Sequence, residues 1–300
     1  MGCCHSNGSR KLGLQHLFHD SKTFPSSAVG ITARELSAYD FSSENFVRDY
    51  LEHVTSQSLL GKSEGKLELR KTHSVPRDYA TIQDALDAAK DGDAIRIAPG
   101  RYKEALVIRS RIMLVGLGKV DETVLEAPDE SIFFAASALP TLILEASEAR
   151  VCNVTIVGGG ASVPVVENMC GDLTLEGCDI RSGACGLRVQ DSAGAILRFC
   201  DVRSCHEHGV NVSKQGWVSI EKSYIFDCKC GVLVGHLGSQ GSLRGTDIAS
   251  CSQVGVMAHS LGAVLLESNH IHDNTVAGVF VSSGGRAVLK QVMFLARISM

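Results

Sequence analysis

The chain has 300 residues, of which 44% are hydrophobic, and its formal net charge is −4 at pH 7. This length favours one elongated domain with an N-terminal extension. The weak negative charge excludes the strongly basic surface of most nucleic-acid-binding proteins, so we expect no nucleic-acid partner. The sequence has no apolar run of about 18 residues or more, and we therefore expect neither a transmembrane helix nor a secretory signal.

The first six residues, MGCCHS, fit the pattern for N-terminal lipidation. Removal of the initiator Met would leave Gly2 free for myristoylation, and Cys3 and Cys4 beside it are acceptors for palmitate. One myristoyl chain binds a membrane only marginally, whereas two lipids give stable anchoring. We therefore predict a protein attached to the cytoplasmic face of a membrane. The alternative is that the motif occurs by chance and the two thiols are simply exposed.

Three regions follow one another along the chain. Residues 1–30 are rich in Ser, Gly and His and predict a flexible, lipidated arm. Residues 31–72 predict a helical extension and a linker, with helical periodicity over residues 32–60. Residues 75–300 predict a parallel β-helix, for the reasons given below.

A short amphipathic helix is predicted over residues 78–89, at the start of the β-helix. Thr81 is its N-cap, with Asp84 three residues further on. Its apolar stripe consists of Ile82, Ala85, Leu86 and Ala89. The ends of a solenoid expose strand edges, so we expect this helix to cover the N-terminal end. Strands are predicted directly after it, over residues 94–97, 106–108 and 112–115.

From residue 173 onward the sequence repeats every 22 or 23 residues, in three apolar columns. The first column contains Ile180, Val202, Ile225, Ile248 and Ile271. The second contains Leu175, Leu197, Ile220, Leu243, Leu266 and Leu289. The third contains Leu187, Val210, Val232, Val256 and Val279, each preceded by a glycine that we interpret as a turn residue.

These columns predict an all-β fold, a right-handed parallel β-helix with one coil per repeat of about 23 residues. Each coil has three short strands with alternating inward and outward side chains, and a single coil cannot bury its apolar face without a stacked neighbour. Helices are excluded because no run of about 10–12 residues at the 3.6 period fits between the glycines. The last coil begins at residue 287 and ends without its final strand. We therefore expect either a partner on this edge or a chain that is a shortened form of a longer protein. The alternative is that residues 294–300 fold over the end themselves.

The cysteines of the repeats also recur in register. Cys205, Cys228 and Cys251 lie 23 residues apart, and Asn274 continues the series. A free cysteine packs like a small hydrophobic residue, so this series predicts a ladder that lines one turn. The 11 cysteines are an odd number with no disulfide framework, and we expect reduced thiols.

The start of the solenoid resembles that of a known superfamily. The matching segments are residues 79–85 (YATIQDA), Gly92-Asp93, residues 99–104 (PGRYKE) and residues 114–116 (LVG). They are similar to the pectin-lyase-like right-handed parallel β-helix proteins, which include sugar-binding and hydrolase repeats, pectin methylesterases and β-helical F-box-only proteins. The resemblance covers residues 75–295 and implies the fold. It does not imply an activity, because enzymes and non-enzymes share these segments.

The candidate catalytic residues are outward side chains on adjacent coils: Asp179 and Asp201, with Arg181 and Arg203 two residues further on. Two carboxylates beside two arginines are suited to acid–base chemistry or to binding an acidic sugar. The alternative is that they neutralise one another on a solvated face. We expect Tyr224 and Phe226 to interrupt these columns, with no third acid at a comparable position. The further motifs of pectin methylesterases and polygalacturonases are absent from the sequence.

Two pairs of histidines flank single residues, His206 with His208 and His270 with His272. The second pair shares an outer face of one strand, but a metal site also needs carboxylates or further imidazoles. The pairs lie three coils apart and cannot share an ion. We interpret them as solvated histidines, and expect neither a metal site nor a cofactor.

The function that these features favour is a non-catalytic, membrane-tethered interaction or scaffold protein. Its partner, a protein, would bind the β-helix face or the open C-terminal edge. The β-helical F-box-only proteins suggest a substrate-recognition module, although residues 32–60 lack the Leu-Pro start of an F-box. The alternative is a carbohydrate-binding or pectinase-like β-helix that acts through Asp179 and Asp201.

Overall fold

The computed structural model of the chain describes residues 70–128 and 139–295. The predicted arm, its lipidation sites Gly2, Cys3 and Cys4, and the helix over residues 32–60 lie outside the described residues. The boundaries proposed for the three regions therefore remain predictions.

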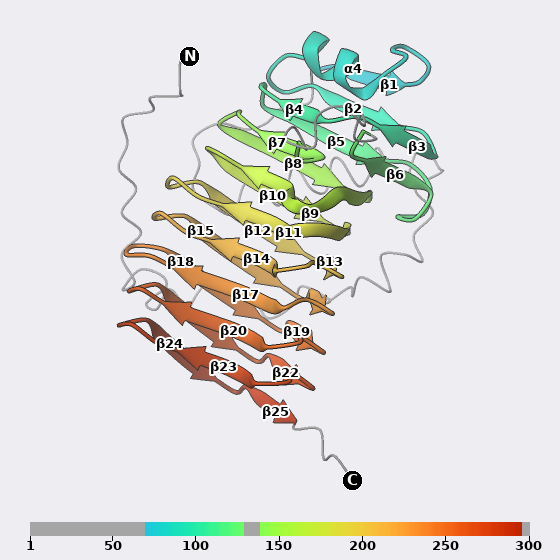
Figure 1. Cartoon of the computed structure of the whole chain (residues 1–300). Coiled ribbons are helices and arrows are strands. Elements are labelled where there is room, and N and C mark those ends of the chain that lie inside the picture. The colour runs from blue at the N-terminus through green and yellow to red at the C-terminus, as the bar shows by residue number, and fades with distance from the viewer. Residues whose placement is uncertain (1–69, 129–138, 296–300) are drawn as a thin grey trace.

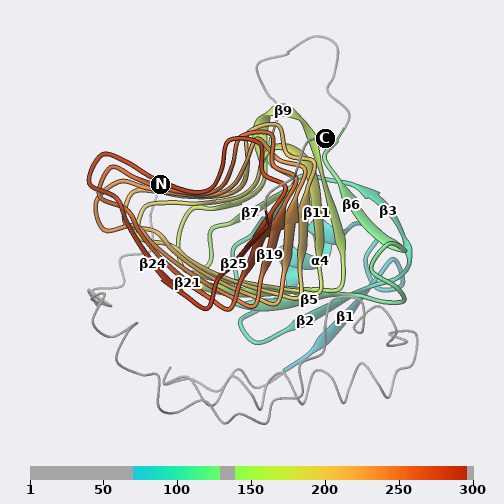
Figure 2. The ribbon, with the colours of Figure 1, turned by 90° about the horizontal axis from the view of Figure 1, so that it is seen from below.

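The described residues form 25 strands and one short helix, stacked as successive coils of a parallel β-helix (Figure 1). Figure 2 views the coils from below, one behind another. Neighbouring strands in every sheet are parallel and belong to successive coils. The predicted all-β solenoid is confirmed.

Three faces surround the core. The first face is a ten-stranded sheet of β1 (Thr72–Val75), β2 (Ala94–Ile97), β5 (Ile112–Gly116), β8 (Glu148–Cys152), β10 (Asp172–Glu176), β12 (Gly194–Arg198), β15 (Trp217–Glu221), β18 (Gln240–Arg244), β21 (Ala263–Glu267) and β24 (Arg286–Lys290). The short-strand face contains β3 (Gly100–Lys103), β6 (Thr123–Glu126), β13 (Asp201–Arg203), β16 (Tyr224–Phe226), β19 (Asp247–Ala249), β22 (His270–His272) and β25 (Met293–Leu295). The third face contains β4 (Leu106–Ile108), β7 (Leu142–Leu144), β14 (His208–Val212), β17 (Cys230–Gly235), β20 (Val254–His259) and β23 (Ala277–Val281).

Two long strands, β9 (Thr155–Asn168) and β11 (Asp179–Val189), run from the short-strand face into the third face. The first residues of β11 pair with β13, and its last residues pair with β14. Through these two strands the short-strand and third faces form one 15-stranded sheet.

The three predicted apolar columns stack in register and form the core. In the first column Ile180 pairs with Val202, Val202 with Ile225, and Ile248 with Ile271. The second column pairs Leu175 with Leu197 and continues to Leu289, and the third pairs Leu187 with Val210 and continues to Val279. Side chains of the first column are at most 1% exposed, so each coil buries its apolar residues against the coils on either side.

The glycines that precede the third column lie inside strands, not in turns as we interpreted them. A Cβ atom added at Gly186 in β11 would lie 2.6 Å from the carbonyl oxygen of Gly209 in β14. Gly209 stands in the same relation to Gly231 in β17. These positions therefore need glycine because the backbones of successive coils approach closely.

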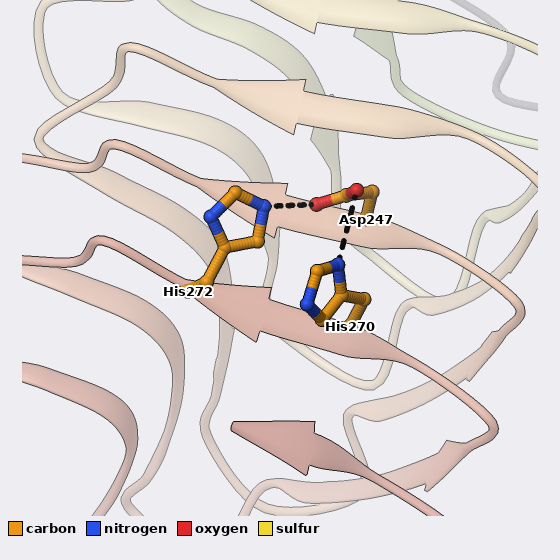
Figure 3. A group of neighbouring side chains, drawn as sticks. All are labelled: Asp247, His270 and His272. Carbon is orange, nitrogen blue, oxygen red and sulfur yellow. Dashed lines mark hydrogen bonds and ion pairs between the residues drawn. The ribbon is translucent and has the colours of Figure 1, made fainter. Parts of the chain in front are cut away.

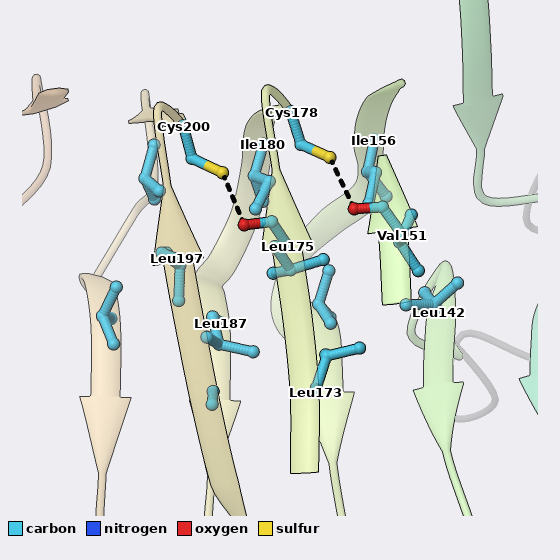
Figure 4. Packing of buried hydrophobic residues seen from close by; sticks show 14 of the residues in the cluster. Leu142, Val151, Ile156, Leu173, Leu175, Cys178, Ile180, Leu187, Leu197 and Cys200 are labelled. Carbon is cyan, nitrogen blue, oxygen red and sulfur yellow. Dashed lines mark hydrogen bonds between the residues drawn. The ribbon is translucent and has the colours of Figure 1, made fainter. Parts of the chain in front are cut away.

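The turns contain two ladders of small side chains, and the sequence predicted one of them. Cys205, Cys228 and Cys251 are buried as expected, and Asn274 donates its amide to the Ile248 carbonyl at 3.1 Å. The second ladder lines the turn between the first and short-strand faces and contains Cys178, Cys200, Ser223, Thr246 and Asn269. In Figure 4, Cys178 and Cys200 each donate a thiol hydrogen bond to a carbonyl of the preceding coil, from Val151 and Leu175. The nine described cysteines are free thiols.

The N-terminal end of the solenoid is covered by α4 (Ile82–Ala88), which confirms the predicted cap. Thr81 accepts the Asp84 amide at 3.0 Å, as the sequence predicted. Glu104, just after β3, accepts the backbone amides of Ile82 and Gln83 at 3.0 and 2.9 Å. The carboxylate thereby binds two amides that have no partner within the helix.

The adjacent strand β1 was not predicted. Its His73 forms a buried hydrogen bond with Asp93, with Nε2 and Oδ2 3.0 Å apart. Asp93 also accepts the Lys90 amide at 3.0 Å. Burial alone would raise the pKa of Asp93, but the Lys90 amide and His73 outweigh it and lower this pKa. Asp93 and Glu104, both in the segments that carry the superfamily resemblance, thus join the first coils to each other and to the cap.

At the C-terminal end, β23, β24 and β25 form the last described coil. Its inward side chains lack a covering coil among the described residues, and Leu289 is 44% exposed although its column is buried elsewhere. The other exposed large apolar side chains there are Val276, Phe280, Val281, Val288, Met293, Phe294 and Leu295.

Candidate functional site

The outward side chains of the short-strand face form two columns that run across successive coils. From β11 to β25, the first column reads Asp179, Asp201, Tyr224, Asp247, His270 and Met293. The second reads Arg181, Arg203, Phe226, Ala249, His272 and Leu295. Strand alternation explains this arrangement, because residues i and i+2 of a strand point to the same side. The structure therefore brings the four sequence-predicted candidates together on one face.

Asp179 is held by arginines from its own coil and the next. Both of its carboxylate oxygens accept hydrogen bonds from Arg203, from Nε at 3.0 Å and from Nη2 at 2.9 Å. Arg181 lies further away, with its Nε 3.7 Å from Oδ2. These hydrogen bonds raise the pKa of the Arg203 guanidinium. The Asp179 carboxylate thus forms a bidentate ion pair with Arg203, and the Asp179 side chain is only 15% exposed.

Asp201 has a different environment, although it is the register neighbour of Asp179. Burial raises its pKa, the charge of Asp179 raises it further, and Arg203 lowers it only in part. In the folded chain the protonated form of Asp201 is therefore more favourable than it is for an exposed aspartate.

Next to these charged residues, β16 presents two aromatic side chains. The rings of Tyr224 and Phe226 stack with their centroids 4.3 Å apart and their planes 23° apart. The Tyr224 side chain is among the exposed large side chains of the molecule. Burial and the nearby acids Asp247 and Asp201 raise the pKa of the Tyr224 hydroxyl, so it remains protonated at neutral pH.

The expectation that this face has no third acid is wrong. Tyr224 pairs in register with Asp247, which therefore lies in the same column as Asp179 and Asp201. The aromatic residue interrupts the acidic column for one coil, and Asp247 resumes it. The 23-residue step from Tyr224 to Asp247 was the signal that could have identified this position.

Asp247 lies beside both histidines of β22 (Figure 3). Its Oδ1 is 3.0 Å from His272 Nε2, and its Oδ2 is 3.4 Å from His270 Nδ1. Partial burial lowers the pKa of His272, but the hydrogen bond that the ring donates to Asp273 and the charge of Asp247 outweigh it and raise this pKa. The two histidines are therefore paired with carboxylates, whereas the sequence led us to expect solvated side chains.

The other predicted histidines lie elsewhere. His206 is exposed in a turn, and His208 begins β14 at the edge of the third face. Burial lowers the pKa of His208. They are on earlier coils than His270 and His272, in agreement with the prediction that the two pairs are separate. Gly2, Cys3 and Cys4 lie outside the described residues. Among those described, no helix is long and apolar enough to cross a membrane.

Comparison with protein families identifies residues 164–292 as a match to the family model described as "Right handed beta helix region". Among curated proteins, the chain is similar to SHC SH2 domain-binding protein 1 homolog A of Xenopus laevis. The two are 22% identical over 153 residues, which is 50% of this chain and 21% of that protein. The match thus spans about a fifth of the relative's length.

Solved structures of carbohydrate-active enzymes have a similar fold. A pectin methylesterase from Aspergillus niger matches with a TM-score of 0.52 and 17% identity, over 80% of this chain and 89% of the enzyme. The pectate lyase Pel9A matches with a TM-score of 0.53 and 11% identity, over 77% of this chain and 79% of the enzyme. At these identities the matches show the fold alone. Together with the family model, they confirm the predicted fold: the chain is a right-handed parallel β-helix.

Proposed function

We propose that this chain is a non-catalytic recognition module that binds a protein partner through its β-helix. The surface that we assign to the partner is the stretch of the short-strand face from Asp179 to His272. The resemblance of the first solenoid segments to those of β-helical F-box-only proteins fits the same proposal. In that case the chain would present a bound protein to other factors.

The observation that carries this proposal is the state of Asp179. An acid–base or nucleophilic carboxylate needs an oxygen free to meet the substrate. Both oxygens of Asp179 instead accept hydrogen bonds from Arg203, with Arg181 close by. This arrangement favours a structural role for Asp179, Arg181 and Arg203, in which they hold the binding surface in place.

The composition of the face also supports protein recognition. Arginine, tyrosine and tryptophan are enriched among the residues that dominate interface energies, and phenylalanine is enriched in interface cores. On this face the stacked pair of Tyr224 and Phe226 lies one coil from Arg203. A rigid aromatic pair beside an oriented guanidinium loses little conformational freedom when a partner binds.

A second surface that we assign to partner binding is the last described coil. Phe280 on β23 and Val288 on β24 are 43% and 41% exposed, and both point outward. Within residues 70–128 and 139–295 no further strand pairs with this coil, and parallel strands in this position offer an edge to which a strand of a partner can pair.

The name of the curated relative suggests a specific partner to test. That protein is named for binding an SHC SH2 domain, and its match covers 50% of this chain and 21% of its own length. We extend this property to the present chain as a hypothesis, with the isolated SHC SH2 domain as the probe.

The experiment is a calorimetric titration of the full chain with a purified SHC SH2 domain. We expect saturable binding, and the double variant Tyr224→Ala/Phe226→Ala should weaken it by about tenfold or more, as loss of two central interface aromatics does. The matched control is Leu237→Ala/Leu261→Ala, which removes two exposed apolar side chains from turns outside the short-strand face. A further variant, Phe280→Ser/Val288→Ser, tests the last coil.

Absence of binding would contradict this choice of partner. Equal loss of affinity in the aromatic and control variants would contradict the assignment of the face. Far-ultraviolet circular dichroism of each variant establishes that it retains the fold.

Membrane attachment is the second part of the proposal. We propose that lipids on Gly2, Cys3 and Cys4 hold the module on the cytoplasmic face of a membrane, as the first six residues suggest. The Gly2→Ala variant should move the protein from the membrane fraction to the soluble fraction, because it prevents myristoylation. Mass spectrometry of the N-terminal peptide measures the modification itself. A wild-type chain with an unmodified N-terminus in the soluble fraction would contradict this part and leave the recognition module untouched.

A second candidate function is carbohydrate binding or turnover. The named structural neighbours are a pectin methylesterase and a pectate lyase. The raised pKa of Asp201 beside the ion-paired Asp179 is one arrangement of a proton donor next to a carboxylate. The exposed ring of Tyr224, stacked on the half-buried ring of Phe226, is also suited to contact with a sugar ring. An assay of polysaccharide turnover separates a catalytic β-helix from the first candidate.

A further inference from the structure

Asp247, His270 and His272 bring three metal-binding groups together on two adjacent strands. Asp247 begins β19 and pairs in register with His270, the first residue of β22. His272 is two residues further along β22 and therefore points to the same side as His270. The register partner of His272 is Ala249, whose methyl group leaves room for the imidazole to lean toward Asp247.

The distances between the three side chains suit a bound ion. Their candidate ligand atoms all lie within 4.8 Å of one another. Asp247 is 3.0 Å from His272 Nε2 and 3.4 Å from His270 Nδ1. In a tetrahedral zinc site with bonds of about 2.0–2.1 Å, neighbouring ligand atoms are separated by about 3.3 Å. The three groups can thus surround one ion after small side-chain rotations.

A neighbouring carboxylate fixes the orientation of one histidine. Asp273 Oδ2 lies 2.8 Å from His272 Nδ1, so the opposite nitrogen, Nε2, faces Asp247. Histidine ligands of metals commonly donate their other ring nitrogen to a carboxylate, which sets the tautomer and raises the basicity of the ligating atom. The chain supplies this outer carboxylate from the residue directly after His272.

His270 is the less satisfied of the two histidines. Its Nε2 is buried without a hydrogen-bond partner in the described part of the chain. Its Nδ1 faces Asp247 at a distance longer than a good hydrogen bond, and its ring lies 4.4 Å from that of His272. A ring held in this position by packing presents Nδ1 to the space shared with Asp247 and His272 (Figure 3).

We propose that Asp247, His270 and His272 form a binding site for a divalent transition-metal ion, with zinc as the expected ion. Two imidazoles and one carboxylate are ligands that suit zinc and neighbouring first-row metals. All three side chains are partly exposed, so the ion has access from solvent. Three protein ligands leave a coordination position for water or for a group from a bound molecule. This inference goes beyond the proposed function, and it needs no partner to be tested.

The test is a calorimetric titration of the full chain with Zn²⁺ under reducing conditions. The wild type should bind one more equivalent than His270→Gln/His272→Gln, and than the nearly isosteric Asp247→Asn. The matched control is His236→Gln/His259→Gln, which removes a second pair of neighbouring histidines, with ring centroids 6.1 Å apart. The control should keep the wild-type stoichiometry. Asp273→Asn should keep the stoichiometry and weaken binding about 10–100-fold, as loss of an outer carboxylate does.

Titration with Co²⁺ separates this site from cysteine sites, because bound thiolates add a charge-transfer absorption in the near ultraviolet. We expect the equivalent lost in Asp247→Asn to show the visible bands of bound Co²⁺ without thiolate absorption. The proposal is overturned if the site variants, shown to be folded by circular dichroism, bind as many equivalents as the control. It is equally overturned if the lost equivalent carries thiolate absorption.

Discussion

Asp179 and Asp201 are the same residue type, at the same position of successive coils, in different surroundings. Arg203 reaches back across one coil and binds both oxygens of Asp179, although its register neighbour is Arg181. Asp201 lies on the same strand as Arg203. Burial disfavours the ionised carboxylate of Asp201, and the charge of Arg203 stabilises it only in part. Burial and the charge of Asp179 therefore raise the pKa of Asp201.

The raised pKa of Asp201 predicts a pH-dependent gain of stability in Asp201→Asn. An acid whose folded pKa is raised favours folding when protonated, and this contribution is lost as pH rises through the folded pKa. The asparagine imitates the protonated state, so the variant should be more stable than the wild type at pH 7. The gain should shrink toward zero below about pH 4, near the ordinary aspartate pKa. Thermal unfolding at the two pH values measures this difference.

The matched control is Asp179→Asn, for which we expect the opposite sign. It removes the partner of two charge-assisted hydrogen bonds, so the free energy of unfolding at pH 7 should fall by about 1–3 kcal/mol. A loss of stability in Asp201→Asn at pH 7, or a gain that does not change with pH, would contradict this account of the two acids.

For single residues, the sequence predicted which side chains share a face but not which of them form ion pairs. The repeat period placed both acids and both arginines in register. The length and rotation of each arginine side chain decide which acid it binds, and neither can be read from spacing. The third acid, Asp247, was missed because Tyr224 replaces an acid in the coil between, although the period remains intact through it.

Among the elements, the cap helix depends on a residue that is distant from it in sequence. Glu104 binds the first two amides of α4, and Gln83 of α4 exchanges hydrogen bonds with the backbone of Val107. These contacts hold the helix over the first coil, where Ile82, Ala85 and Leu86 are buried.

Replacement of Glu104 by alanine should therefore lower the free energy of unfolding by about 1–3 kcal/mol, as expected for loss of a charged helix cap. Urea unfolding measures the change. The matched control is Asp121→Ala, which removes an exposed carboxylate from the next coil and should alter stability by less than about 0.5 kcal/mol. Equal effects of the two changes would show that Glu104 does not act as a cap.

The stacked columns give a second prediction for the elements. Ile225 is fully buried between Val202 and Ile248. The Ile225→Ala variant leaves a cavity and should cost about 2–5 kcal/mol of stability, measured by urea unfolding. Leu261→Ala, at an exposed turn, is the control and should have little effect. A small effect of Ile225→Ala would mean that the inward register assigned to this column is wrong.

The strands of the repeats and the cap helix could be predicted from the sequence because their periods and caps are local signals. Strand β1 could not, because Thr72–Val75 is a short polar segment whose only reason to be extended is its pairing with β2. The glycines of the third column were misassigned to turns for a similar reason. Their requirement comes from the backbone of the neighbouring coil, which is remote in sequence.

For the whole molecule, the repeat made the architecture predictable, since each coil contacts only its neighbours and the same pattern recurs along the axis. Function is less predictable from the same pattern, because this architecture supports both enzymes and binding proteins. The functional assignment therefore depends on the short-strand face, where Asp179 is paired with arginines, Asp247 lies beside two histidines and the ring of Tyr224 is exposed.

The measurement that tests the non-catalytic assignment most directly is turnover of acidic polysaccharides by the full chain. Pectin, oligogalacturonate and alginate are incubated with the wild type and with Asp179→Asn/Asp201→Asn, and methanol release, new reducing ends and unsaturated products are quantified. The account predicts no product from the wild type beyond that formed with the double variant. Product formation by the wild type that is lost in the folded double variant would contradict it and establish the face as an active site.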